Sequence, residues 1–140
     1  MASMVFNKFN CLAGNVGLGV HNLNTDTLKV MLTDVAPVAT NTVKANITEI
    51  AAGNGYSAGG VAVGSNAYSQ TSGLGELTGN NVVLTATGGA IAQFRYAVLY
   101  DATVSGGPLI GWWDNGVEIN LQPTQAFTLQ FSSNGILTLQ

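Results

Sequence analysis

Apolar and polar residues alternate along much of this chain, and this period of two limits its fold more than any other feature. Residues 28–33, 117–121 and 127–131 each place an apolar side chain at every second position. That pattern predicts β-strands with one face buried. The longest run, residues 90–101, has Phe94, Tyr96, Val98 and Tyr100 at alternate positions and apolar residues between them as well. It predicts a central strand that is covered on both faces.

Turn-forming residues divide these runs into short pieces. Asn-Gly and Gly-Gly pairs supply the positive φ angles that tight hairpins require. The clusters are Asn24-Thr25-Asp26, residues 52–55, Gly59-Gly60, residues 79–81, Gly88-Gly89, residues 105–108, Asp114-Asn115-Gly116 and Ser133-Asn134-Gly135. Short strands separated by such clusters indicate an antiparallel sandwich or barrel. For the last part of the chain we expect an antiparallel meander of strands 108–113, 116–121, 125–131 and 135–139.

The rest of the chain gives weaker signals. Ile47, Ile50 and Ala51 fall at helical spacing, so we expect at most one short helix, over residues 42–51. The Gly-, Ser-, Asn- and Thr-rich residues 53–79 predict a long excursion or an extended arm. Residues 1–16 are interpreted as an N-terminal arm on a single domain that spans residues 1–140.

Charge is scarce, which points to a surface that contacts other proteins. Four residues are Lys or Arg and seven are Asp or Glu among 140, whereas a typical soluble domain has about a quarter of its residues charged. The surface must therefore consist of amides, hydroxyls, glycines and some apolar groups, a composition that favours protein contacts. The net charge of −3 and the scattered basic residues argue against nucleic acid as a partner.

Compartment signals are few. We expect no membrane partner, because no run approaches the roughly 18 apolar residues of a spanning helix. The N-terminus lacks the features of a secretory signal, so we expect synthesis in a cytoplasm. One cysteine, Cys11, allows no intrachain disulfide.

Catalytic and metal-binding patterns are not found in the sequence. His21 is the only histidine and is expected to be a partly exposed strand residue rather than the partner of a Cys11 nucleophile. One Cys and one His cannot form a zinc site. Asp101 and Asp114 are expected to cap turns, with calcium binding as the alternative. The glycines of residues 53–60 lack the lysine and spacing of a nucleotide loop. We therefore predict no enzyme, no cofactor and no metal.

Seven apolar or aromatic residues are the candidates for a protein interface. Trp112 and Trp113 are adjacent on a predicted strand, so one is expected in the core and the other outside or in a subunit contact. Stacking on a sugar is the alternative for this pair. Tyr56 is expected to anchor a sharp excursion of the backbone. The full set of candidates is Met4, Val5, Phe6 and Phe9 of the arm, together with Tyr56, Trp112 and Trp113.

Four segments resemble, in the same order, a family of small tailed-bacteriophage proteins counted among the structural components of the virion. They are residues 26–32 (DTLKVML), 48–60 (TEIAAGNGYSAGG), 95–101 (RYAVLYD) and 108–114 (PLIGWWD). The likeness spans roughly residues 17 to 139, and its most specific part is the segment 48–60. The resemblance implies a β-sandwich of jelly-roll type. It also implies a capsid decoration, or cement, protein that forms trimers where capsomers meet, and it transfers no catalytic residues.

The expected function is therefore that of a non-enzymatic virion protein. It would lie on the outer surface of the capsid, bind the major capsid protein and copies of itself as a homotrimer, and stabilise the lattice. A tail or tail-fibre component that binds a host surface glycan is the alternative.

Overall fold

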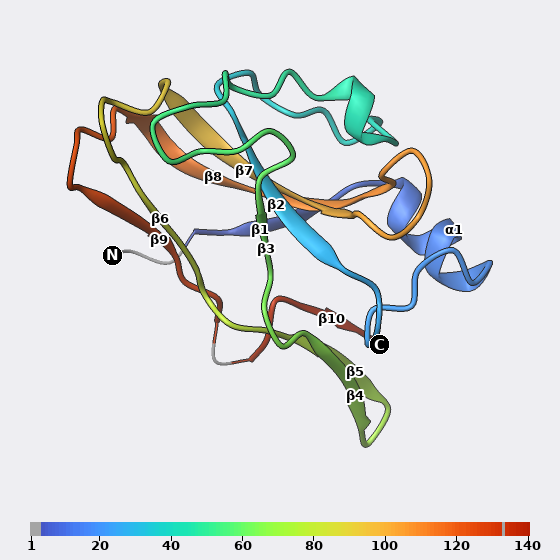
Figure 1. Cartoon of the computed structure of the whole chain (residues 1–140). Coiled ribbons are helices and arrows are strands. Elements are labelled where there is room, and N and C mark those ends of the chain that lie inside the picture. The colour runs from blue at the N-terminus through green and yellow to red at the C-terminus, as the bar shows by residue number, and fades with distance from the viewer. Residues whose placement is uncertain (1–3, 133) are drawn as a thin grey trace.

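The chain adopts an all-β, sandwich-like fold with a single short α-helix in the part that the structure describes (Figure 1). The structure is a computed structural model that describes residues 4–132 and 134–140. Within these residues, no helix has the length and apolar content needed to cross a membrane. The predicted fold class is confirmed.

A five-stranded antiparallel sheet forms the centre of the molecule. Its strand order is β1-β8-β7-β2-β3. The strands are β1 (Phe6–Lys8), β2 (Leu28–Thr33), β3 (Val61–Ala62), β7 (Phe94–Asp101) and β8 (Leu109–Ile119). The predicted central strand 90–101 is confirmed as β7, which pairs with β2 on one side and β8 on the other.

Two smaller sheets pack against one face of the large sheet. The first has the order β10-β5-β4 and the second pairs β6 with β9. Their strands are β4 (Ala67–Thr71), β5 (Leu74–Thr78), β6 (Val82–Thr85), β9 (Ala126–Leu129) and β10 (Leu137–Leu139). Figure 1 shows the β4–β5 hairpin at one end of the molecule and the β6–β9 pair at another. The core between the layers includes an edge-to-face contact of Phe94 with Phe127, with ring centroids 5.1 Å apart.

The opposite face of the large sheet is also buried. Ala97 and Leu99 of β7 point into the core between the sheets, while Val98 and Tyr100 belong to a second apolar cluster. Phe9 is buried in this second cluster, and Ile47 packs against it. The sequence placed Phe94 on the same side as Val98, but a shift of register between Phe94 and Tyr96 turns Phe94 to the other face. A strand covered on both sides explains why both of its faces are apolar.

The predicted C-terminal meander is wrong. Strand β8 continues through the Asn115-Gly116 turn signal, because Asp114 pairs with Tyr96 and Ile119 with Phe94. The four residues 115–118 of β8 therefore lie opposite the single residue Arg95 of β7. They form a bulge and not a hairpin. Strand β9 pairs with β6, and β10 pairs with β5. A turn signal fixes local backbone geometry, whereas the burial of apolar faces selects the partner strand.

The predicted helix is misplaced. Residues 42–51 contain only a 3₁₀ turn, η1 (Lys44–Asn46), whereas the α-helix α1 spans Cys11–Gly17. Helix α1 includes two glycines and has no side-chain cap, so its sequence carries no helix signal. Residues 53–79 are not a structureless excursion, because they contain β3 and the β4–β5 hairpin.

The expectation of a free N-terminal arm is corrected for the residues that the structure describes. Strand β1 pairs with β8, where Phe6 lies opposite Trp113 and Lys8 lies opposite Gly111. A side chain at position 111 would collide with the Phe6 ring, so glycine there permits the close approach of β1. Residues 1–3 of the expected arm, and Ser133 of the last turn cluster, lie outside the described residues.

The entry to β3 offers a test of the sheet edge. Gly60 has φ +85°, and a Cβ there would meet the Val30 carbonyl of β2. Gly73 has φ +82° in the β4–β5 turn, with open space where its Cβ would be. The positive φ costs about 1–2 kcal/mol for alanine at either position. We expect Gly60→Ala to lower the free energy of unfolding by clearly more than Gly73→Ala, measured by urea denaturation. Equal losses would mean that β2 does not constrain Gly60.

Candidate functional site

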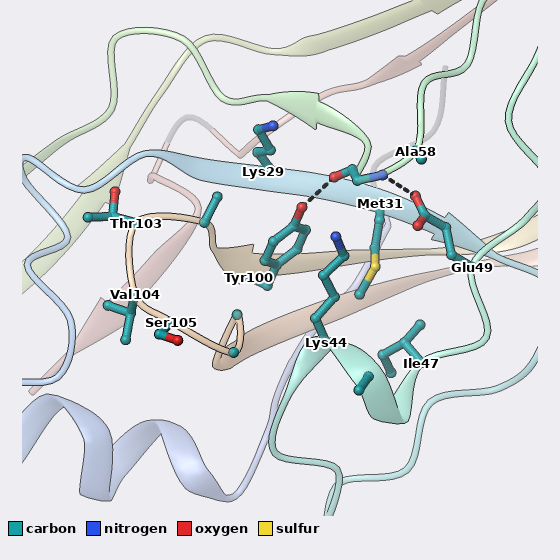
Figure 2. A pocket seen from close by; sticks show the side chains of 15 residues that line it. Lys29, Met31, Lys44, Ile47, Glu49, Ala58, Tyr100, Thr103, Val104 and Ser105 are labelled. Carbon is teal, nitrogen blue, oxygen red and sulfur yellow. Dashed lines mark hydrogen bonds between the residues drawn. The ribbon is translucent and has the colours of Figure 1, made fainter.

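A cavity of about 720 Å³ opens on the face of the large sheet that carries the second apolar cluster. Figure 2 shows how strands β2 and β7 provide its floor, with η1, the 58–59 backbone and the turn 102–107 around it. The volume lies within the range of about 300–1,000 Å³ found for small-ligand sites. Its lining includes Lys29, Met31, Lys44, Glu49 and Tyr100.

Tyr100 is the centre of the cavity floor. Lys29 of β2 is its partner across the strand pair, so both side chains lie on the same face of the sheet. The Lys44 ammonium lies 5.3 Å from the centroid of the Tyr100 ring, a distance at which a cation is attracted to the ring face. The Tyr100 hydroxyl donates a hydrogen bond of 2.5 Å to the Gly59 carbonyl. Tyr100 therefore joins β7 to the segment 48–60.

Glu49 holds the other end of that segment. Its Oε2 accepts hydrogen bonds from the Tyr56 hydroxyl at 2.5 Å and from the Gly59 backbone N–H at 2.7 Å. The Tyr56 hydroxyl in turn accepts from the Leu32 N–H of β2 at 3.0 Å. Burial, and then the hydrogen bond to Glu49, raise the pKa of Tyr56 far above its ordinary value. Tyr56 therefore remains a donor, and its predicted role as the anchor of the excursion is confirmed.

The cavity gathers positive charge in an acidic chain. Lys29 and Lys44 are two of the four basic residues of the protein, and Glu49 is the one carboxylate among the lining residues. Across residues 4–132 and 134–140, neither lysine has a carboxylate within 4.0 Å. Both lysines are half-buried, so water compensates their charge only in part.

His21 is not the partly exposed strand residue that the sequence predicted. It lies in the loop before β2, and its side chain is fully buried with Nδ1 2.9 Å from Asp101 Oδ2. Its Nε2 has no hydrogen-bond partner in the described structure. The carboxylate pairing with Asp101, eighty residues away, explains how a histidine can be buried here.

Asp101, besides pairing with His21, also contacts the turn at the edge of the cavity. Its Oδ1 accepts from the Thr103 N–H at 3.0 Å, so it caps the turn 102–107 as predicted. Burial, together with a hydrogen bond to Asp26, raises the pKa of Asp101. The same hydrogen bond lowers the pKa of Asp26. The turn 102–107, which borders the cavity, is therefore held by the buried Asp101.

Asp114 also caps a turn as predicted, and it has a second role. Its carboxylate accepts two hydrogen bonds from Arg95, at 2.8 and 3.2 Å, and one from the Gly116 N–H at 2.7 Å. The Arg95 guanidinium lowers the pKa of Asp114 below its ordinary value. This ion pair closes the base of the 115–118 bulge.

Three of the seven candidate interface residues are buried inside the chain. Phe9 and Tyr56 are each 2% exposed and Trp113 is 3% exposed, so none can reach a partner in this conformation. Met4 and Phe6 are half-buried against the core, while Val5 is 75% exposed.

The two tryptophans do face opposite sides, as predicted. Trp113 packs with Phe6 in the core between the sheets, at a centroid distance of 4.8 Å. Trp112 is half-buried on the other face, with its ring centroid 4.6 Å from that of Phe9.

Comparison of the chain with protein-family models, with curated proteins and with solved structures finds no match. The chemistry of the site therefore rests on its own residues. Within residues 4–132 and 134–140, no three His, Cys, Asp or Glu side chains are arranged to hold a metal ion. Partial burial raises the pKa of the Cys11 thiol, whose sulfur lies 3.5 Å from the Leu109 carbonyl.

Sequence reasoning missed the two lysines of the cavity. They are fifteen positions apart, on a strand and on a 3₁₀ turn, and counted only as scattered basic residues. For Lys29, the available signal is the alternation of residues 28–33, which places Lys29 on the same face as Met31.

Substitution of Tyr56 tests the hydrogen-bond network. In Tyr56→Phe, the buried Leu32 N–H loses its acceptor and Glu49 loses a donor. We expect a loss of about 1–3 kcal/mol in the free energy of unfolding, measured by urea denaturation. The control is Tyr96→Phe, at a half-buried tyrosine whose hydroxyl has no hydrogen-bond partner in the described structure, and there we expect a change within about 0.5 kcal/mol. If both variants lost equally little, the network would not stabilise the fold.

The Arg95–Asp114 pair predicts a pH dependence. Because the folded-state pKa of Asp114 is lowered from 3.8, the pair stabilises the fold above that pH and loses this effect as the pH falls through the lowered value. Titration of the Asp114 carboxyl carbon by NMR should give a midpoint below 3.8 in the wild-type chain. In Arg95→Gln the midpoint should rise. An unchanged midpoint would show that Arg95 does not set this pKa.

Proposed function

We propose that this chain is a non-enzymatic structural protein of a bacteriophage particle, and specifically a capsid decoration protein. In this role it binds the major capsid protein on the outer surface of the head and stabilises the lattice. It is made in the host cytoplasm and assembles as a homotrimer. The proposal goes beyond the fold, which many unrelated functions share.

The weakly charged surface is the observation that carries this proposal. Of the eleven residues of the chain that carry a formal charge, Asp101 is buried and Arg95 is paired with Asp114. Large apolar side chains are exposed instead: Val5, Leu18, Val35, Val38, Leu74, Val83 and Val117. Such a surface can be buried against another protein without leaving unpaired charges, which are costly in an interface.

The segments that resemble the phage family give a second line of support. Residues 48–60 carry the most specific part of the resemblance, and here Glu49, Tyr56 and Gly59 hold the backbone in place by hydrogen bonds. Residues 26–32, 95–101 and 108–114 form parts of the adjacent strands β2, β7 and β8. In this chain the shared residues serve the architecture of the sheet, as expected for a protein whose role is mechanical.

The glycan-binding alternative has less support. It requires an exposed shelf of aromatic side chains, but Trp113 is buried and Trp112 packs against Phe9. If the alternative were correct, host polysaccharide would quench the tryptophan fluorescence of the purified chain. A decoration protein should show no such quenching.

Charged substitutions on intact particles test the proposal. In the phage that encodes the chain, each of the seven exposed apolar residues is replaced in turn by lysine. Binding that buries any of these side chains would leave the new charge unpaired, so we expect occupancy on purified particles to fall about tenfold or more for at least one variant. Occupancy is measured by quantitative mass spectrometry. The control is Gln122→Lys, at an exposed polar position outside the apolar set.

Three results would contradict the proposal. They are absence of the wild-type chain from purified particles, wild-type occupancy for every lysine variant, and an electron-microscopy map of the particle that places the chain on the tail. Deletion of residues 1–10 is not a suitable variant, because it removes β1 and the buried Phe9 and so disturbs the fold itself.

A further inference from the structure

We propose that the cavity over Tyr100 is a binding site for a carboxylate-bearing ligand, held by Lys29 and Lys44. The proposal is independent of the role in a phage particle. It rests on where the two ammonium groups lie, on the charges that surround them and on the shape of the cavity.

The two lysines come from separate elements and line one cavity (Figure 2). Lys44, on η1, places its ammonium group 5.3 Å from the centroid of the Tyr100 ring. Lys29 is opposite Tyr100 across the β2–β7 pair, so it lies on the same face of the sheet. A ligand in this cavity therefore lies beside one lysine from each of the two elements.

The walls of the cavity are fixed by hydrogen bonds, while neither lysine has a carboxylate partner among the described residues. The Tyr100 hydroxyl is fixed by the Gly59 carbonyl, and the turn 102–107 is fixed by Asp101. The one carboxylate in the lining, Glu49, already accepts two hydrogen bonds from the segment 48–60. In a chain with a net charge of −3, a region with two lysines and one carboxylate is a local site of positive charge.

The charge balance favours a carboxylate over a phosphate. Two lysines and Glu49 leave one net positive charge, which a single carboxylate matches, whereas a phosphate dianion exceeds that charge and is repelled by Glu49 about twice as strongly. The cavity also lacks the arginine fork that suits phosphate geometry. Met31 and Ile47 add apolar surface for an aliphatic stem next to the charged group.

The carboxylate could be the acidic side chain of another protein or a free small molecule. Two probes, each with one carboxylate, separate these sources: the blocked tripeptide acetyl-Gly-Glu-Gly-amide and free glutaramate, the monoamide of glutarate. Glutaramide, the diamide, is the neutral control for glutaramate, and inorganic phosphate tests the choice of anion. Each is titrated into the ¹⁵N-labelled full chain, and binding is followed at the backbone amides of Gly59, Gly106 and Gly107, which line the cavity.

We expect saturable shifts of these amides with a carboxylate probe and none with glutaramide. Lys29→Gln and Lys44→Gln should each weaken binding about threefold or more, as loss of one half-exposed charge pair predicts. Lys8→Gln is the control, because Lys8 lies on β1 and does not line the cavity. Stronger binding of the tripeptide than of glutaramate would assign the site to a protein side chain, and the reverse to a small molecule.

Any one of three titration results would overturn the proposal. They are no saturable shift with either carboxylate, equal shifts with glutaramide, or tighter binding of phosphate than of both carboxylates. If Lys44→Gln does not fold, Lys44→Met keeps the packing of the stem and removes the charge. Salt gives a further check without any variant, because the Debye length falls from about 10 Å at 0.1 M to about 3 Å at 1 M. Binding that does not weaken over this range would also contradict the proposal.

Discussion

Burial of the central sheet on both of its faces is the constraint on which the rest of this structure depends. Along β7, Ala97 and Leu99 point into the core between the sheets, and Val98 and Tyr100 point into the second cluster. Each face therefore needs its own cover. The smaller sheets cover one face, where Leu12 of α1 and Phe6 of β1 also pack. The other face is covered by η1 and the neighbouring loops, together with Phe9. Residues 6–12 therefore contribute to both covers, which explains why they pack on the sheet instead of extending from it.

The two covers differ in kind, and the candidate site follows from the difference. Where the smaller sheets pack on the large sheet, the core between them is continuous and apolar. Loops cannot close as tightly, so the other face keeps a cavity over Tyr100 whose walls are held by hydrogen bonds instead of strand pairing. Glu49 and Tyr56 fix one wall, and Asp101 fixes another through Thr103. The polar residues that stabilise this side of the fold are therefore the same ones that shape the cavity.

The sequence predicted the strands better than their partners. Alternation located β2, β7 and β9, because burial of one or both faces is a local property of a strand. Pairing is not local, so the predicted meander failed: β9 joins β6 across forty residues of chain, and Asn115-Gly116 forms a bulge. Helix α1 was missed because tertiary packing, and not propensity, supports it. The lysines of the cavity and the His21–Asp101 pair were missed for the same reason, since only the fold brings them together.

The bulge in β8 makes one part of the central sheet tolerant of change. Residues 115–118 stand outside the ladder, residues 116–118 are exposed, and the Arg95–Asp114 pair closes their base. The strand keeps its register on either side, so extra chain introduced here need not disturb the core. A foreign epitope grafted between Asn115 and Glu118 would be displayed from the central sheet rather than from a chain end.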